Sequence, residues 1–146
     1  MSLSGRKRIA SVEAFPLRAR TGKGPRIALG SLVDRPALLL RVVDDRGCFG
    51  WGEIWANYPS RANCHKAHLV EDVVSGDLAG FTFAEPREAS DYLRTRRENY
   101  FLHAGQSWVF EHILAGLDLA LWDLSLRDSG QSFAEYKKLG RDSARS

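Results

Sequence analysis

The stretch SWVFEHILAGLDLALWDLSLRDSG, residues 107–130, decides the fold because it predicts a single long helix. A serine side chain accepts a hydrogen bond from a free amide of the first helical turn, so Ser107 is expected to cap this helix. Glycine readily adopts the left-handed conformation that ends helices, so Gly130 is expected just beyond the last turn. At about 1.5 Å per residue, the helix would be roughly 33 Å long, which is the width of a small domain.

Two apolar stripes run along this predicted helix. Residues spaced i, i+3, i+4 and i+7 share one face, and the first such set is Phe110, Ile113, Leu114, Leu117, Leu121 and Leu124. The second set lies nearly opposite and consists of Ala115, Leu119, Trp122 and Leu126. A helix at the edge of a domain needs one apolar stripe, whereas a helix with two is covered on both sides. The central question is therefore what covers the Trp122 side.

Composition excludes several classes of function. The 146 residues, 44% hydrophobic and 27% charged, fit one domain with a core and argue against disorder. The net charge is +3, and the basic runs at 6–8 and 94–97 lack the interleaved aromatic residues that single-stranded nucleic acid requires. No apolar run approaches about 20 residues, and we see no signal peptide and no disulfide framework. We therefore expect no nucleic-acid or membrane partner and a reduced, cytoplasmic location.

The first third of the chain predicts a meander of three antiparallel strands. Their expected ranges are 9–17, 37–43 and 48–55. The run Asp44 to Gly47 is a turn sequence that joins the second strand to the third. Alternation along the third strand places Gly50 and Gly52 on one face. Two glycines on one face predict the close approach of another backbone.

Two connections leave the same end of this meander. One comprises residues 18–35, with three glycines and a proline, and the other comprises residues 56–59. The first and third strands of a meander run in the same sense, so the loops that follow them emerge together. Long loops in compact domains are often functional. We therefore expect a rim of two loops that closes over something.

The remainder of the chain predicts helices, so the fold class is α+β. The expected helices span 60–74, with Ser60 as its cap, then 86–99, 107–130 and 132–139. The run Ser75 to Asp77 is expected to break the first of them.

Side-chain chemistry alone indicates no active site. Cys64 and His68 are spaced i, i+4, but a zinc site needs three or four converging ligands, so a helix surface is the favoured interpretation. Glu53, Asp118 and Asp123 are candidate acids or bases. For these three, pairing with arginines or backbone groups is the favoured interpretation. We expect no inward-facing lysine that would complete a reaction.

The run LAGLDLALWDL, residues 114–124, resembles the A-x-D-x-A-L-W-D-L helix of the mandelate racemase/muconate lactonizing enzyme family in the enolase superfamily. Residues 12–17, VEAFPL, and 50–53, GWGE, resemble the first and third strands of that family. The resemblance covers about residues 9–141. Two departures follow the motif, since Arg127 and Ser132 stand where the family pattern has lysine and proline. The resemblance implies an enolase-like N-terminal capping domain, a three-stranded meander followed by three to four helices.

The resemblance also implies what this chain lacks. Enzymes of the family continue into a TIM barrel that carries the lysine and histidine acid/base residues and the carboxylates that hold Mg²⁺. The full-length protein would then be a magnesium-dependent isomerase or lyase that abstracts a proton α to the carboxylate of a small substrate. We therefore expect this chain to be inactive alone, with no catalytic or metal-binding residue, and to have a barrel domain as its partner. The whole enzyme is expected to be a homo-oligomer.

By the same resemblance, the loops at 19–34 and 55–61 reach over the barrel mouth and select the substrate. The candidate substrate-facing residues are Arg26, Ile27, Leu29, Leu32, Trp55 and Tyr58, for which packing within the loops is an equal alternative. The expected division of the chain is a flexible tail or added leader at 1–8, the capping domain at 9–140, and the start of a linker at 141–146. The alternative function is a non-catalytic, free-standing α+β module that binds a partner or self-associates through the second helix stripe.

Overall fold

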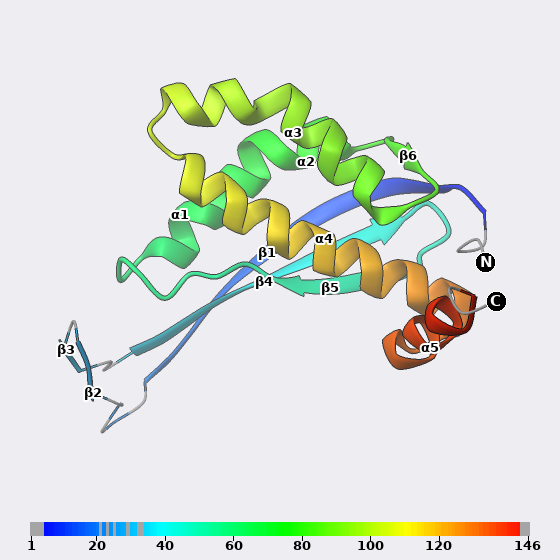
Figure 1. Cartoon of the computed structure of the whole chain (residues 1–146). Helices are drawn as coiled ribbons and strands as arrows, with labels where there is room; N and C mark the ends of the chain where they lie inside the picture. The colour runs from blue at the N-terminus through cyan, green and yellow to red at the C-terminus, as the bar shows by residue number, and fades with distance from the viewer. Residues whose placement is uncertain are drawn as a thin grey trace.

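An antiparallel sheet with helices packed on one face forms the body of the chain (Figure 1). The computed structural model describes residues 5–20, 22, 24, 26–28, 30–31 and 34–143. The sheet has the strand order β5-β4-β1-β6. Its strands are β1 (Lys7–Arg20), β4 (Asp34–Asp44), β5 (Phe49–Glu53) and β6 (Thr82–Phe83), while β2 (Arg26–Ile27) and β3 (Gly30–Ser31) form a separate small hairpin. The predicted α+β fold and its meander of β1, β4 and β5 are confirmed.

The strands differ from the predictions in their extent. Pairing of β1 with β4 continues to Arg20 opposite Asp34, so much of the connection predicted at 18–35 is strand. Pro16 lies inside β1, beyond the two residues that pair with β6, where the outer edge of β1 has no neighbouring strand among the described residues. That position tolerates proline because no backbone donor is needed there. The two-residue strand β6 was missed because so short a segment has no periodicity.

The first helical segment is longer than predicted. It consists of α1 (Ala62–Leu69), a π-helical turn (Val70–Val74) and α2 (Ser75–Leu78). The predicted break at Ser75 is wrong, because the Ser75 hydroxyl donates a hydrogen bond of 2.6 Å to the Val12 carbonyl on β1 and so ties the helix to the sheet. Ser60 is not the cap either, since Arg61 occupies that position without a side-chain hydrogen bond.

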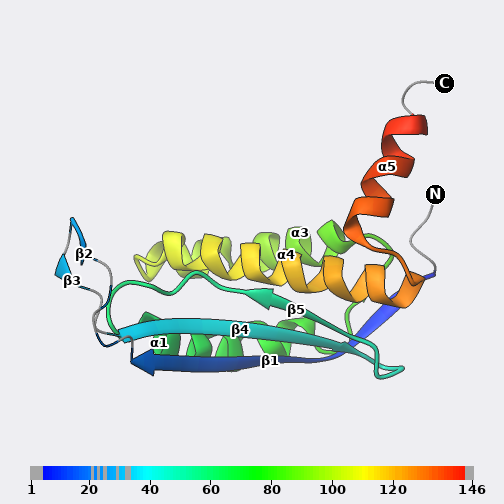
Figure 2. The same ribbon diagram turned by 90° about the horizontal axis from the view of Figure 1, so that it is seen from below.

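The helices α3 (Pro86–His103) and α4 (Ser107–Ser129) follow, and α5 (Phe133–Ser143) leaves from the end of α4. Figure 2 shows α5 turning away from the two layers of the body. Gly130 has φ 66° and ends α4 as predicted. The predicted N-cap is wrong by one residue, because Gln106 holds that position and makes no side-chain capping bond.

The core lies between α4 and one face of the sheet. All six residues of the first predicted stripe are buried, and so are alternate residues of β4, among them Leu38, Leu40 and Val42. The glycine face of β5 touches α4 directly. An added Cβ at Gly52 would lie 2.0 Å from the Gly116 carbonyl oxygen, and one at Gly50 would lie 2.1 Å from the Ala120 carbonyl oxygen. The predicted close approach of another backbone is confirmed, and that backbone is α4.

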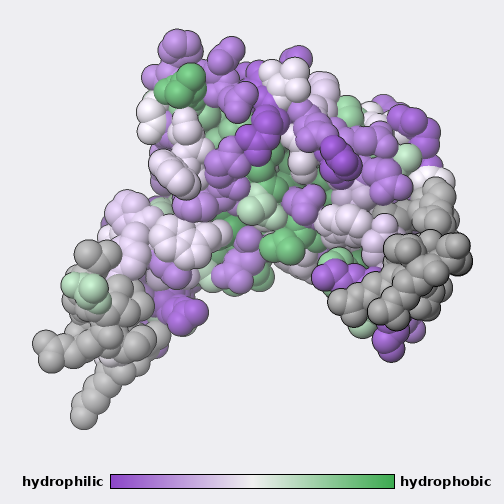
Figure 3. Space-filling model, in the orientation of Figure 1, coloured by the Kyte–Doolittle hydropathy of each residue, from purple (hydrophilic) through white to green (hydrophobic). Residues whose placement is uncertain are grey.

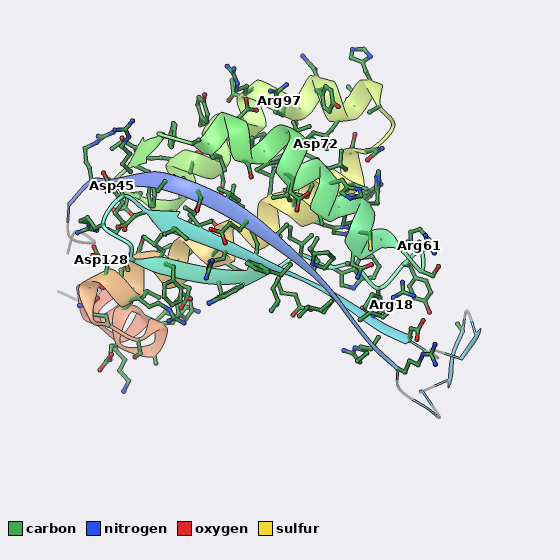
Figure 4. The ribbon with its side chains drawn as sticks, turned by 180° about the vertical axis from the view of Figure 1, so that it is seen from behind. Arg18, Asp45, Arg61, Asp72, Arg97 and Asp128 are labelled. Carbon is green, nitrogen blue, oxygen red and sulfur yellow. The ribbon has the colours of Figure 1, made fainter. Side chains whose placement is uncertain are left out.

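Ion pairs join the start of β1 to the end of α4. The ammonium of Lys7, a residue that is buried, lies 3.3 Å from Asp128. Arg46, in the β4–β5 turn, contacts both Asp128 and Asp44 at 2.9 Å. Asp45 and Asp128 mark this end of the molecule in Figure 4, opposite the β2–β3 hairpin. The strand β1 begins at Lys7, two residues before the predicted first strand.

Candidate functional site

The two predicted loops do emerge from one end of the sheet. β4 is antiparallel to both β1 and β5, so the segments that follow β1 and β5 leave at the same end of the sheet. In Figures 1 and 2 the β2–β3 hairpin and the segment after β5 extend from that end. The geometry of a two-loop rim is therefore present.

The candidate residues of the rim fall into three groups. Trp55 is 48% exposed and Tyr58 is half-buried, and both belong to the segment after β5. The backbones of Arg26 and Ile27 form β2. Leu29 and Leu32 lie outside the described residues. The structure thus places Trp55 and Tyr58 on one loop and leaves the substrate-facing role of all six residues a prediction.

Arg18, near the end of β1, links the two loops, and the sequence did not single it out. Its guanidinium donates a 3.0 Å hydrogen bond to the Asp34 carboxylate, where the first loop rejoins the sheet. The same group donates to the Ser60 carbonyl of the second loop. Asn63, at the start of α1, donates to the Leu17 carbonyl at 2.8 Å. Arg18 and Arg61 both lie at this end of the sheet in Figure 4.

A buried lysine, which the sequence did not single out, holds the second loop through hydrogen bonds. Lys66 on α1 is 2% exposed. Its ammonium donates hydrogen bonds to the Trp55 carbonyl and, at 2.9 Å, to His112 Nδ1 on α4. Burial lowers the pKa of Lys66. Burial, followed by the charge of Lys66, lowers the pKa of His112.

A groove of about 760 Å³ lies between the sheet, α4 and α5. Figure 3 shows the surface hollowed below α4, with apolar side chains gathered there. The residues that line it are Leu39, Trp51, Gly52 and Glu53 from the sheet, Asp118, Leu119, Trp122, Asp123 and Leu126 from α4, and Phe133, Tyr136 and Lys137 from α5.

The second apolar stripe of α4 is covered only in part. Leu126 is buried, and the Trp122 ring meets the rings of Tyr136 and Phe133 at 5.2 and 6.2 Å. Leu119, one turn before Trp122, stays 55% exposed. α5 therefore covers the C-terminal end of the stripe, and the part around Leu119 stays open toward the groove.

The three candidate acids have different environments. Asp123 accepts the Trp51 amide at 2.8 Å and the Arg127 guanidinium at 2.9 Å, as the pairing interpretation predicted. Glu53 is exposed. Asp118 is half-buried on the groove wall, and burial raises the pKa of its carboxyl group. None of the three is placed with a base or nucleophile that would define a reaction centre within the described ranges.

The described residues include no group of three or more His, Cys, Asp or Glu side chains placed to hold a metal ion. Cys64 and His68 are both exposed on α1. Over the same part of the chain, no helix combines the length and apolarity needed to cross a bilayer.

Comparison with solved structures identifies the fold. A mandelate racemase/muconate lactonizing enzyme from Bordetella bronchiseptica RB50 matches with a TM-score of 0.76 and 34% identity, over 86% of this chain and 32% of that one. An enolase from Bradyrhizobium, solved with magnesium and mandelic acid, matches with a TM-score of 0.69 and 25% identity, over 87% of this chain and 33% of that one.

A curated protein agrees with the structural matches. The o-succinylbenzoate synthase of Bacillus subtilis (strain 168) is 25% identical over 133 residues, which are 87% of this chain and 32% of that protein. No family model matches the chain. The fold and these matches define an N-terminal capping domain of the enolase superfamily. Within that superfamily, the more similar of the two solved structures is a mandelate racemase/muconate lactonizing enzyme. It spans about a third of the length of the relatives it matches.

Proposed function

We propose that this chain caps the active site of an enzyme that abstracts a proton α to a carboxylate. The observation that carries the proposal is the two-loop rim at one end of a domain that matches a third of a racemase/lactonizing enzyme at 34% identity. The Bradyrhizobium relative, solved with magnesium and mandelic acid, supports a small carboxylate as the substrate and Mg²⁺ as the cofactor. Loops that close over a site exclude water and select the substrate. Arg26, Ile27, Leu29, Leu32, Trp55 and Tyr58 are the residues we assign to that contact.

The magnesium ion and the acid/base residues belong, in this proposal, to a barrel domain outside the chain. The described residues offer no cluster that fits a metal ion. Bound Mg²⁺ would stabilise an enolate, and the chain's own contribution is to cover the substrate and exclude water. The division into a tail at 1–8, a cap at 9–140 and a linker at 141–146 belongs to this proposal, as do a homo-oligomer and a cytoplasmic location.

The groove at α4 is the surface we assign to the barrel domain. Its wall carries Leu119, which is more than half exposed, and Trp122, which α5 covers only in part. Apolar surface of this kind is stabilised by a partner that removes it from water. The open sheet face beside it presents Leu39 and Trp51, so the partner would contact both the sheet and α4. The same open groove also favours the alternative function, in which the chain self-associates.

A chimera tests the capping function. This chain would replace the matching third of the Bordetella bronchiseptica relative, and the assay would follow solvent deuterium entering the α-carbon of carboxylic acids. We expect magnesium-dependent exchange by the chimera and none by this chain alone. Exchange catalysed by the chain alone would refute the assignment of the chemistry to a barrel. A folded chimera that shows no exchange with any acid the parent enzyme accepts would contradict the capping function.

Two leucines provide a matched test of the groove. Leu119 in the groove and Leu102 on α3 are 55% and 58% exposed, so an aspartate at either position loses a similar area of apolar surface. We expect L119D to reduce exchange by the chimera about tenfold or more, because it places a charge in the interface. The control variant L102D is expected to keep the activity. Equal activities of the two variants would show that the barrel docks elsewhere.

A further inference from the structure

Three elements meet at the buried ammonium of Lys66. α1 contributes the lysine, α4 contributes His112, and the segment after β5 contributes Trp55. The Trp55 and His112 rings are 5.0 Å apart, and the ammonium lies 5.2 Å from the centre of the Trp55 ring. Trp55 is thus held through both its backbone carbonyl and its ring.

The Trp55 carbonyl needs this partner because the sheet has ended. β5 stops at Glu53, and the Ile54 amide donates to the Leu38 carbonyl at 2.9 Å as the chain leaves the sheet. An apolar side chain of similar length would fill the site of Lys66 without the cost of burying an ammonium group. A lysine at this position instead supplies donors to two elements at once, which fixes the direction in which the loop departs.

The contact between Lys66 and His112 indicates the protonation state of the His112 ring. An ammonium group only donates hydrogen bonds, so His112 Nδ1 accepts, and the imidazole is neutral with its proton on Nε2. The nearby counter-charge is Glu111 on α4, whose carboxylate is held by two hydrogen bonds from Arg94 on α3. On the other side, His65 contacts the Gln106 side chain at 2.9 Å. A proton on His112 would place two cations in contact, one of them on a lysine that is 2% exposed.

We infer that Lys66 and His112 form a clamp that positions Trp55, and with it the loop of residues 55–61, only while the His112 imidazole is neutral. In this inference Lys66 and His112 are positioning residues, which act on the loop through Trp55. The importance of the loop for substrate rests on the proposed function, whereas the clamp itself is a property of this chain. Acidification through the titration of His112 removes the acceptor, and the loop is released.

Nuclear magnetic resonance of the full chain tests the clamp. The Trp55 indole signal, assigned with a W55F variant, and the His112 ring signals would be followed from about pH 8 to about pH 5. We expect both to change with one midpoint, below the ordinary value for histidine. In H112Q, glutamine still accepts from Lys66 but does not titrate, so the Trp55 signal is expected to stay in its high-pH position. The control H65Q removes the neighbouring histidine and is expected to leave the wild-type response intact.

A second variant tests the lysine. K66M is expected to move the His112 midpoint back toward the ordinary value and to speed amide exchange at residues 55–61 about tenfold, the effect of losing one charged hydrogen bond. A Trp55 signal that ignores the His112 titration in the wild type, or that still shifts in H112Q, would overturn the inference. Failure of the chimera to exchange deuterium would leave these signals unaffected, so the clamp and the capping function are separately refutable.

Discussion

Replacing Gly52 by alanine is the sharpest test of how this domain is held together. The added Cβ would lie 2.0 Å from the Gly116 carbonyl oxygen and 2.9 Å from the Ala120 amide nitrogen, whereas ordinary contact begins at 3.4 Å. Both neighbours are backbone atoms of α4, so no side chain can rotate away to make room. The strand and the helix must therefore separate by roughly 1 Å, in a core packed as densely as an organic crystal.

Such a separation is costly because α4 carries the largest share of the core. A gap of about 0.5–1 Å loses a quarter to a half of the dispersion energy of the atoms that face it. Overpacking in a core usually costs about 1–3 kcal/mol, and here the six buried side chains of the stripe from Phe110 to Leu124 move with the helix. We expect G52A to lower the free energy of unfolding by about 3 kcal/mol, out of a total of about 5–15 kcal/mol. The domain would still fold.

Urea denaturation followed by circular dichroism measures this effect, and a second glycine provides the control. Gly76 is exposed in α2, and nothing lies within 4 Å of its added Cβ. G76A is therefore expected to stabilise the chain by about 0.5–1 kcal/mol, the difference between glycine and alanine in a helix. With a slope of about 2 kcal/mol/M, G52A would move the urea midpoint down by about 1.5 M. A G52A midpoint within the error of the wild type would refute the close strand–helix contact.

Two aspartates are expected to respond to pH in opposite ways. Hydrogen bonds from Arg97 and then Arg96 lower the pKa of Asp77, so its stabilising effect is present above the ordinary aspartate range and is lost as acid protonates the folded state. D77N should therefore cost about 1–3 kcal/mol at neutral pH in urea titrations, and the difference from wild type should shrink as the pH falls below the ordinary aspartate range. Burial raises the pKa of Asp118, so its carboxylate destabilises the fold above the ordinary range. D118N should raise the thermal midpoint at neutral pH and leave it unchanged in acid, and a D118N chain that melts earlier at neutral pH would contradict the geometry of the groove wall.

Much of the fold followed from the sequence because each rule applies locally. The stripe from Phe110 to Leu124 predicted a buried helix face, and that face is buried. Gly50 and Gly52 predicted a close backbone, because a missing side chain in a regular strand needs a reason. The errors arise from contacts between distant parts of the chain. Ser75 indicated a helix break, yet its hydroxyl found an acceptor on β1 that no local pattern records.

The candidate site was less predictable because it depends on contacts between distant elements. That both loops leave the same end of the sheet could be predicted from strand direction alone. The contact of Arg18 with Ser60 joins residues 42 positions apart, and that of Lys66 with His112 joins residues 46 positions apart. Lysine is normally exposed on a helix, and Lys66 gave no sign of burial in the pattern of its neighbours. The one available signal was Trp55, an aromatic residue placed where a strand ends.

The glycine contact and the Lys66–His112 clamp lie on one face of α4. His112 precedes Gly116 by four residues, so the two are neighbours on the helix surface. An added Cβ at Gly116 would meet the Ile54 side chain at 2.4 Å and the Glu53 carbonyl oxygen at 3.1 Å. One turn earlier, the His112 ring packs on Trp55. Successive turns of α4 thus contact successive residues of the segment in which the chain leaves β5.

The distance between α4 and β5 should therefore determine the position of the His112 ring relative to Trp55. A separation of roughly 1 Å is large compared with the tolerance of a hydrogen bond of 2.9 Å between Lys66 and His112. We expect G52A to uncouple the Trp55 signal from the titration of His112, and G76A to keep the two coupled. A destabilised G52A chain that retained the coupling would show that the loop is positioned from α1 alone. The expected result would instead show that the packing that stabilises the core also places the loop.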